Sequence, residues 1–405
     1  MTAAAGTSSG FRGRAAVLRH DNFRLLFVAT FGSGIGNWLA LIALPADLYV
    51  RTHHSGWWIS AVLVASVLPA IAIGLLFGPL VDRLSRKGLM ITSDLGRLVV
   101  FAALPFVSAP AVIVALAAVA GIGNGFFRPA VLAGLPNLVA DEELADANAL
   151  LQLAEWATTA VGPLLGGVIV AFSGPHLAYF LNAGTFAASA AFVGWIPGRL
   201  LQSARSIGRG HWRDLGDGFR AIGRSRILMT VLVAWTIAQV WFGFVNVAEI
   251  YLAKRAYNSG FFGFGLLWSA TGVGLIVGGL SLRALSARFS VRMLYPRALL
   301  LLAIGSAGAA VAPNVWVGVV AMIVCGIGNA IAIVQNITLV QRGAPDVLRG
   351  RALTAIMSAN YSMMLIAFLV AGPLTNAVGP RPVYGIAAGW VLVAALVSIR
   401  MLEDG

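Results

Sequence analysis

The stretch FRLLFVATFGSGIGNWLALIALPADLY (Phe23–Tyr49) decides how this chain must fold. An α-helix rises about 1.5 Å per residue, so about 20 apolar residues cross the roughly 30 Å hydrocarbon core of a bilayer. The stretch is longer than that and has Gly and Pro in its interior, whereas barrel strands alternate polar and apolar residues over roughly 10 positions. It therefore predicts a membrane-spanning helix, retained as a first span rather than cleaved as a signal peptide.

Similar runs recur along the whole chain. Of the 405 residues, 59% are hydrophobic and only 11% are charged, which is far outside the range of water-soluble domains. We predict an all-α membrane protein with about twelve transmembrane helices. The predicted spans are 23–50, 57–81, 89–108, 110–131, 147–172, 176–197, 227–252, 261–284, 293–312, 314–338, 350–376 and 382–401.

The tetrapeptide Gly-Ile-Gly-Asn occurs three times, at Gly34–Asn37, Gly121–Asn124 and Gly326–Asn329. Glycine lets helices approach closely in lipid, so helix packing explains the glycines. An amide that faces hydrocarbon needs a partner or a cavity, which makes the three asparagines harder to explain by packing alone. The second and third copies are 205 residues apart, and GPHLAYFLNAG (Gly174–Gly184) faces GPRPVYGIAAG (Gly379–Gly389) at the same offset.

An internal duplication explains these offsets. Further upstream the offset is 200, where LLFGPLVDR (Leu75–Arg83) faces LIVGGLSLR (Leu275–Arg283), and a five-residue length difference would reconcile the two. We predict two parallel six-helix pseudo-repeats related by an axis along the membrane normal. The expected domains are an N-terminal bundle (1–197), a cytoplasmic Arg-rich linker (198–226) and a C-terminal bundle (227–405).

The net charge of +13 is distributed unevenly over the predicted loops. If the N-terminus is cytoplasmic, nearly all 28 basic residues lie on the cytoplasmic side, against Arg51, Lys254, Arg255 and Arg381 outside. This is the positive-inside distribution, and it predicts a multi-pass inner-membrane protein with both termini in the cytoplasm. The basic residues therefore orient the protein, and we do not expect nucleic acid as a partner.

Neither a cofactor site nor enzyme chemistry is expected. The single cysteine, Cys325, lies in an apolar run, so neither a disulfide framework nor a thiolate metal site is available. His53 and His54 fall in a short outer loop that reads as a solvated turn rather than a metal site. No phosphate-binding loop or Ser-His-Asp arrangement has a plausible context, so no metal, no cofactor and no ATP-driven step are predicted.

The segment GPLVDRLSRK (Gly78–Lys87) resembles the signature loop of the major facilitator superfamily, Gly-x-x-x-Asp-Arg-x-Gly-Arg-Lys, with Ser85 in place of the second Gly. Almost the whole chain resembles the macrolide-efflux and enterobactin-exporter branch of that superfamily. The stretches that carry this likeness are FRLLF (Phe23–Phe27), ALPADLY (Ala43–Tyr49), SDLGR (Ser93–Arg97), ANALLQ (Ala147–Gln152), VGPLLGG (Val161–Gly167) and PDVLRGRALT (Pro345–Thr354).

The resemblance implies two six-helix bundles that rock around a central cavity and expose it alternately to the two sides of the membrane. It also implies a conformational latch, in which Asp82 engages the N-terminus of span 11 and its neighbours hold it in place. The alternative is that these charges only mark the cytoplasmic interface. The latch set is Gly78, Asp82, Arg83, Arg86, Asp94 and Arg97, the last two being paired one helical turn apart.

Acidic residues within spans are candidates for proton coupling, because an ionised carboxylate in hydrocarbon costs several kcal/mol. Glu155 on span 5 is the strongest: deprotonated it would favour a cationic ligand, and protonated it would release that ligand. The alternative is a buried structural hydrogen bond. Asp47 and Glu249, near the outer ends of spans 1 and 7, could instead form an outer gate with Arg51, Lys254 or Arg255. Arg128 lies near the cytoplasmic end of span 4, so the deep arginine of many antiporters has no counterpart here.

Amides and aromatic rings on the inner spans are candidates for the substrate cavity, because ligand pockets combine apolar walls with a few orienting polar groups. The predicted set is Asn37, Trp38, Trp156, Trp235, Gln239, Trp241, Asn246, Gln335, Asn336, Asn360 and Tyr361. Some of the tryptophans could instead face lipid.

Taken together, these features predict a secondary active transporter, a proton-coupled exporter of amphipathic small molecules such as drugs or siderophores. We expect it to act as a monomer, with its substrate, protons and membrane lipid as partners. An alternative on the same fold is a flippase of lysophospholipids, and a more distant one is a non-transporting membrane sensor or scaffold.

Overall fold

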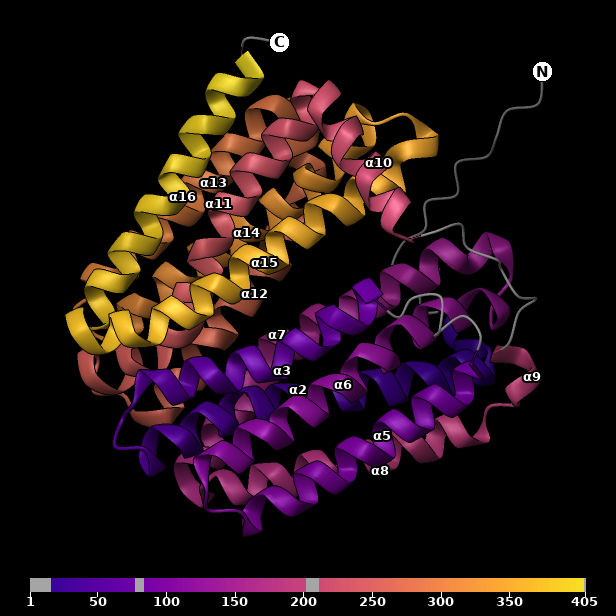
Figure 1. Ribbon diagram of the computed structural model, residues 1–405, viewed down its shortest axis with the longest axis vertical. Coiled ribbons are helices and arrows are strands. Elements are labelled where there is room, and N and C mark those ends of the chain that lie inside the picture. Colours follow the sequence, from indigo (N-terminus) through magenta and orange to yellow (C-terminus); the bar gives the residue numbers. More distant parts are fainter. Residues whose placement is uncertain (1–15, 77–83, 202–210, 404–405) are drawn as a thin grey trace.

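A computed structural model describes residues 16–76, 84–201 and 211–403, and it divides them into two helical bundles (Figure 1). The helices of the N-terminal half are α2 (Asp21–Arg51), α3 (Gly56–Leu76), α5 (Arg86–Ala103), α6 (Pro110–Gly134), α7 (Leu144–Ser173) and α8 (Pro175–Trp195). Those of the C-terminal half are α11 (Arg226–Tyr251), α12 (Gly260–Arg288), α13 (Val291–Val311), α14 (Val315–Gly343), α15 (Asp346–Val378) and α16 (Pro380–Glu403).

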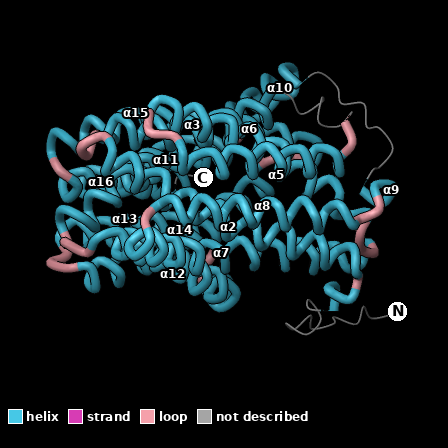
Figure 2. The backbone as a smooth tube through the Cα atoms, turned by 90° about the horizontal axis from the view of Figure 1, so that it is seen from below, coloured by secondary structure: helices cyan, strands magenta, loops and turns pink. Residues whose placement is uncertain are grey.

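The prediction of twelve spans is confirmed. Within the described residues, twelve helices are long and apolar enough to cross a membrane, and each matches one predicted run to within several residues. Within each half the helices lie side by side (Figure 2). Polar side chains cap several of them: Ser85 accepts from the Gly88 amide at the start of α5, and Asn314 accepts from the Trp316 and Val317 amides at the start of α14.

The linker contains helices that the sequence analysis missed, because its arginines were read only as charge. The short helix α9 (Gly198–Leu201) is followed by α10 (His211–Arg224), which packs on α15. The Asp217 carboxylate of α10 accepts from Arg351 of α15 at 2.9 Å and from Arg220 at 2.6 Å. A methyl group on Gly218 would lie 2.3 Å from the carbonyl oxygen of Arg351, so the two helices touch at their backbones.

The internal duplication is visible in the packing of equivalent glycines. A methyl group on Gly121 would lie 2.6 Å from the carbonyl oxygen of Ser66, and one on Gly326 would lie 2.2 Å from that of Thr271. Gly326 follows Gly121 by 205 residues, and Thr271 follows Ser66 by the same number. The next pair of helices repeats this relation: the contact of Gly123 with Ser93 joins α6 to α5, and the equivalent contact of Gly328 with Ala298 joins α14 to α13. The six-helix pseudo-repeat is therefore confirmed.

The same relation continues along α3 as far as Ile73, whose contact with Gly125 corresponds to that between Gly278 and Ala330. The offset of 200 read from residues 75–83 therefore does not apply to this part of the helix. The residues that suggested it lie mostly at 77–83, outside the described residues. The described contacts keep the 205-residue offset on both sides of that segment, at Ile73 and at Ser93.

The two halves also share a turn. Gly174 and Gly379 end α7 and α15 with φ of 76° and 84°, a left-handed conformation that glycine adopts without strain. Pro175 and Pro380 follow directly and begin α8 and α16, where a proline costs no hydrogen bond. The Gly-Pro dipeptides that marked the repeat in the sequence are thus the corners of two equivalent helical hairpins.

The halves meet along two helix pairs, α3 with α15 and α7 with α12, which lie on opposite edges of the molecule. We call the end that carries the turns after α2 and α11 the closed side, because the halves touch there. A methyl group on Gly56 would lie 2.3 Å from the carbonyl oxygen of Gly372, and the Gly372 amide donates to Ser60 Oγ at 3.0 Å. The Tyr251 hydroxyl donates to the carbonyl oxygen of His54 at 2.9 Å.

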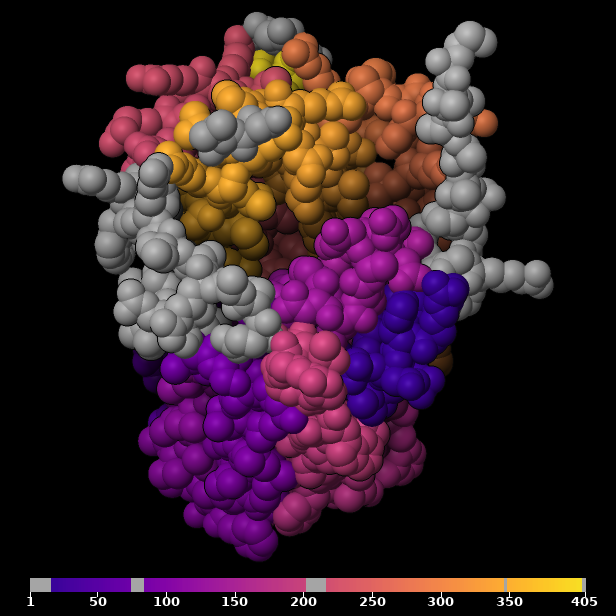
Figure 3. All heavy atoms as spheres, turned by 90° about the vertical axis from the view of Figure 1, so that its right-hand side faces the viewer, coloured from indigo at the N-terminus to yellow at the C-terminus, as the bar shows by residue number. Residues whose placement is uncertain are grey.

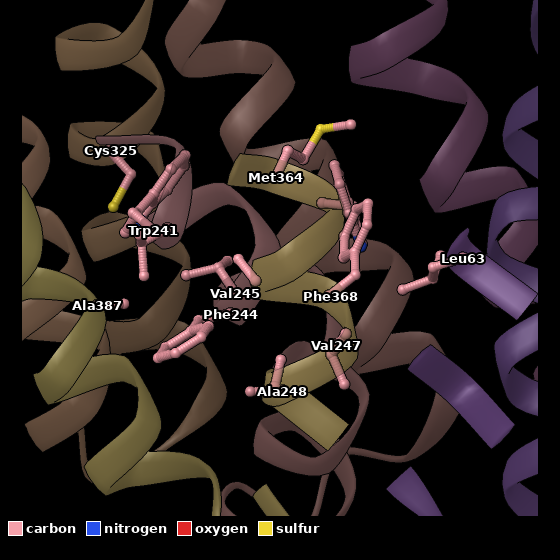
Figure 4. Close-up of a cluster of buried hydrophobic side chains, with 14 of the residues drawn as sticks. Leu63, Trp241, Phe244, Val245, Val247, Ala248, Cys325, Met364, Phe368 and Ala387 are labelled. Atoms are coloured by element: carbon pink, nitrogen blue, oxygen red, sulfur yellow. The ribbon is translucent and has the colours of Figure 1, made fainter. Parts of the chain in front are cut away.

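The opposite end, where α8 ends and α11 begins, is the linker side. The two bundles diverge towards it, and seen from that side the surface is hollowed between the α15 region and the start of α7 (Figure 3). A cluster of buried apolar side chains extends through both halves, and in the C-terminal half it includes Trp241, Phe244, Val245 and Phe368 (Figure 4).

Candidate substrate cavity

A cavity of about 600 Å³ lies on the linker side and is walled by α2, α6 and α7. Its polar lining residues are Thr30, Ser33, Asn37, Asn124, Arg128, Asn148, Gln152, Glu155 and Thr158. Its apolar lining residues are Phe31, Trp38, Phe127, Val131, Leu132, Ala149, Leu151 and Ala154, with Gly34 completing the wall. Ligand pockets typically combine such an apolar surface with a few polar groups.

An ion pair between α6 and α7 is the dominant polar feature of this cavity. Arg128 Nη2 donates to both carboxylate oxygens of Glu155, at 3.1 Å each, and Gln152 Nε2 lies 3.5 Å from Glu155 Oε2. Asn124 precedes Arg128 by four residues and Gln152 precedes Glu155 by three, so each helix presents an amide and a charge on one face. α7 packs on α2, and the two faces both line the cavity, where the Arg128 side chain reaches Glu155.

The pair is wet. The Arg128 side chain is 67% exposed and that of Glu155 is 47% exposed. Ion pairs of this kind contribute only about 0.2–1 kcal/mol to folding, because water solvates both partners when they separate. The hypothesis of a buried structural hydrogen bond at Glu155 does not fit this exposure. The pair can open at little cost, which suits a group that exchanges partners during a cycle.

The repeated Gly-Ile-Gly-Asn motif combines two functions. Its glycines lie in helix contacts: besides Gly121 and Gly326, a methyl group on Gly36 would lie 2.2 Å from the Asn182 Oδ1 of α8. Asn37 and Asn124 are exposed in the cavity, whereas Asn329 is only half-buried in the other half of the molecule. Packing thus accounts for these glycines, and the cavity receives two of the three asparagines.

The other two acidic candidates lie away from the cavity. Asp47 is buried, accepts from Arg51 Nε at 2.5 Å and receives the Tyr179 hydroxyl at 3.2 Å, so it joins α2 to α8. Glu249 is 1% exposed, and its Oε1 has no hydrogen-bond partner within the part of the chain that the structure describes. Its pairing with Lys254 or Arg255 is not seen among the described residues, because Lys254 lies instead over the Phe261 ring at 3.9 Å.

Half of the predicted latch is described. Gly78, Asp82 and Arg83 lie outside the described residues. Arg86 donates to the carbonyl oxygens of Ala133 and Leu201, at 2.8 and 3.2 Å, and so ties α5 to α6 and α9. Asp94 and Arg97 form the predicted pair at 2.5 Å, but it is buried between α5, α6 and α8.

The predicted cavity residues fall into three groups. Asn37 and Trp38 line the cavity, whereas Trp156 is not among its lining residues and has its ring against Gly279 of α12. Trp241 and Asn246 are buried in the C-terminal half, and Asn360 accepts from Thr236 at 2.9 Å. The remaining members also belong to the C-terminal half. Trp235, Gln239 and Tyr361 are half-buried there, and Asn336 is buried. Gln335 lines a separate pocket of about 450 Å³.

Most of the cavity wall is absent from the predicted set, notably Arg128, Asn124, Asn148 and Gln152. Arg128 was set aside because it lies near the end of its span. A signal was present in the spacing of Asn124 and Arg128, which places both on one face of a helix. That this face meets Glu155 depends on how α6 and α7 are placed around the cavity, which no local pattern specifies.

This architecture, two parallel six-helix bundles with a polar cavity open on one side, is that of a membrane transporter. A family model of the Major Facilitator Superfamily matches residues 26–368, and the chain belongs to that family. Its homologues are transporters, and the chain is accordingly a transporter and not an enzyme.

Among curated proteins, the chain is 27% identical to "Multidrug efflux pump Tap" of Mycolicibacterium fortuitum, covering 88% of this chain and 89% of that protein. It is also 27% identical to "Enterobactin exporter EntS" of Citrobacter koseri, covering 95% and 92%. Among solved structures, the nucleoside transporter NupG superposes with a TM-score of 0.75 at 15% identity, covering 94% and 99%, which shows a shared fold. The resemblance to exporters of this superfamily is thus confirmed.

Proposed function

We propose that this transporter is a proton-coupled exporter of amphipathic small molecules that works by alternating access. The single observation that carries the proposal is the cavity of about 600 Å³ that is open on the linker side, while the closed side is held by contacts between the halves. The drug and siderophore exporters among its relatives support the direction of transport. An amphipathic lining with one charged pair suits a substrate with an apolar body and a polar end.

The distribution of charge supports an orientation with the linker side in the cytoplasm. Nearly all the basic residues belong to segments on that side, as the positive-inside rule requires, and both termini would then be cytoplasmic. The structure in this orientation is inward-open, so substrate would enter from the cytoplasm or the inner leaflet. Outward release would require the contacts around Gly56 and Gly372 to separate.

Glu155 is the proposed proton carrier. Ionised, it is held by Arg128 and can hold a cationic group of the substrate. Protonated on the outer side, it loses both attractions and the substrate leaves. Inward proton movement then drives export.

The remaining site residues keep proposed roles outside the proton step. Asp47 would stabilise the outer end of the N-terminal half, and the loop of Gly78, Asp82 and Arg83 would latch the outward-facing state. The residues of the C-terminal half, including Glu249 and Gln239, would become accessible only when the halves rearrange. We also propose that the chain works as a monomer, with each half forming one wall of the path.

The decisive experiment uses inverted membrane vesicles with an acidic interior and a pH-sensitive dye. Adding a panel of drugs and siderophores should release protons from vesicles with the wild-type protein and not from those with Glu155→Gln. The matched control is Asp21→Asn, which removes the acid of an exposed ion pair with Arg24 on the same side but outside the cavity. Transport without proton release in wild type would refute antiport.

The lysophospholipid alternative can be tested in the same vesicles. A long acyl chain would find the Arg128–Glu155 pair and the amides of the wall a poor environment, since these polar groups would lose their water. Excess lysophosphatidylcholine should therefore not reduce drug-dependent proton release. Strong competition at concentrations that leave the vesicles intact would favour lipid as the substrate.

A further inference from the structure

The pairing of Glu155 with Arg128 changes which ligands the cavity can hold. A carboxylate alone would favour a cation, as the sequence suggested. The structure instead presents a guanidinium and a carboxylate side by side, both exposed to the cavity. A cation that approaches Glu155 meets the charge of Arg128 within a few ångströms, and an anion that approaches Arg128 meets Glu155. A ligand with only one charge therefore gains one attraction and suffers one repulsion.

We propose that the preferred substrates are zwitterions, molecules that carry a carboxylate and an ammonium group at one end of an apolar body, as free amino acids and small peptides do. The carboxylate of such a ligand would take the guanidinium of Arg128, and its ammonium group would take the carboxylate of Glu155. One solvated ion pair is thereby replaced by two, and the cavity stays neutral. This inference rests on the proposed function and specifies its substrate class.

The rest of the wall fits the two ends of such a molecule. Phe31, Trp38 and Phe127 supply aromatic surface for the apolar body. Asn37, Asn124 and Gln152 lie in the same wall and can donate to or accept from the polar end. Gln152 already lies 3.5 Å from a Glu155 oxygen, so it can follow that carboxylate when Arg128 turns to the ligand.

Four ligands of one shape separate the charge classes. They are 3-(2-naphthyl)alanine, its methyl ester, its N-acetyl derivative, and the N-acetyl methyl ester, which are respectively zwitterion, cation, anion and neutral. Binding to the purified full-length protein in nanodiscs is followed by quenching of tryptophan fluorescence. Wild type should bind the zwitterion about tenfold or more tightly than each of the others, because only the zwitterion satisfies both charged groups.

Variants locate the effect at the pair. In Arg128→Gln the zwitterion should lose its advantage over the cationic ester, and in Glu155→Gln it should lose its advantage over the N-acetyl anion. The exchange variant Arg128→Glu/Glu155→Arg should keep the zwitterion preference, since it only reverses the pair. Arg24→Gln is the matched control, because it removes an exposed arginine outside the cavity and should bind like wild type.

The results distinguish this inference from the proposed function. If naphthylalanine fails to bind wild type, or binds no more tightly than its methyl ester, the zwitterion proposal is wrong. The exporter proposal fails separately, when no member of the vesicle panel moves protons. Loss of folding in a single variant would show in its melting temperature, and the exchange variant then decides the matter.

Discussion

Two arginine–carboxylate pairs of the N-terminal half differ in their access to water. Asp94 and Arg97 are one turn apart on α5, and their side chains are 0% and 2% exposed. Glu155 and Arg128 belong to two different helices that line the same cavity, and their side chains are 47% and 67% exposed. The buried guanidinium lies between the Phe127 and Phe186 rings, at 4.8 and 4.2 Å from their centroids, whereas the exposed one borders the cavity.

This difference in exposure distinguishes an ion pair that stabilises the fold from one whose charges can change partners. In a dry site, each ion has lost its hydration and depends on its partner, so breaking the pair is costly. In a wet site, water replaces the partner and the pair contributes little to folding. Phe127 connects the two sites, because its ring contacts Arg97 and also lines the cavity that holds Arg128. The buried pair thus packs against a side chain that also lines the cavity of the exposed pair.

The largest expected effect comes from breaking the buried pair. Asp94→Asn should lower the free energy of unfolding by about 3–5 kcal/mol, because it leaves Arg97 buried without a counter-charge. Unfolding of the purified protein, followed by denaturant titration in detergent, measures the loss. The double variant Asp94→Leu/Arg97→Met should recover most of it, since both charges are removed together. A loss below about 1 kcal/mol for Asp94→Asn would contradict the assignment of this pair as structural.

A smaller effect is expected from Gly123→Ala, which crowds the buried pair without removing a charge. The new methyl group would lie 2.9 Å from Arg97 Cγ and 3.2 Å from the carbonyl oxygen of Ser93, so a shift is required. Overpacking of this kind costs about 1–3 kcal/mol. Gly96→Ala, on the same helix as Arg97, has nothing within 4 Å and serves as the control in the same unfolding titration. Equal stability of the two variants would show that the pair is less tightly enclosed than the contacts indicate.

The smallest expected effect on stability concerns the exposed pair. Glu155→Gln and Arg128→Gln should each change the free energy of unfolding by less than about 1 kcal/mol, while altering ligand binding and proton movement strongly. Melting temperatures measured at low and high salt check this, because screening weakens an exposed pair and leaves a buried one nearly unchanged. A destabilisation as large as that of Asp94→Asn would mean that the cavity pair is part of the folded core, and the comparison would fail.

The residue spacing predicted one of these pairs and not the other. Asp94 and Arg97 are one turn apart, so their contact follows from helix geometry alone. Arg128 and Glu155 are 27 residues apart, and their contact depends on the rotation of α6 relative to α7. The candidate cavity residues of the C-terminal half also show that residue type alone does not place a side chain in a cavity. Trp241 and Asn246 have the residue types of a ligand pocket, yet helix packing places them in a filled core.

The sequence by itself determined the membrane environment, the number and order of the spans, the internal repeat and the family. These properties depend on the length of apolar runs, on charge between them and on repeated Gly-Pro and Gly-Ile-Gly-Asn segments, all of which are local. Only the tertiary structure decided which polar groups face the cavity, that Glu155 has a cationic partner, and which end of the molecule is closed. Those properties depend on how helices rotate and cross, which is fixed by side-chain packing between segments far apart in the chain.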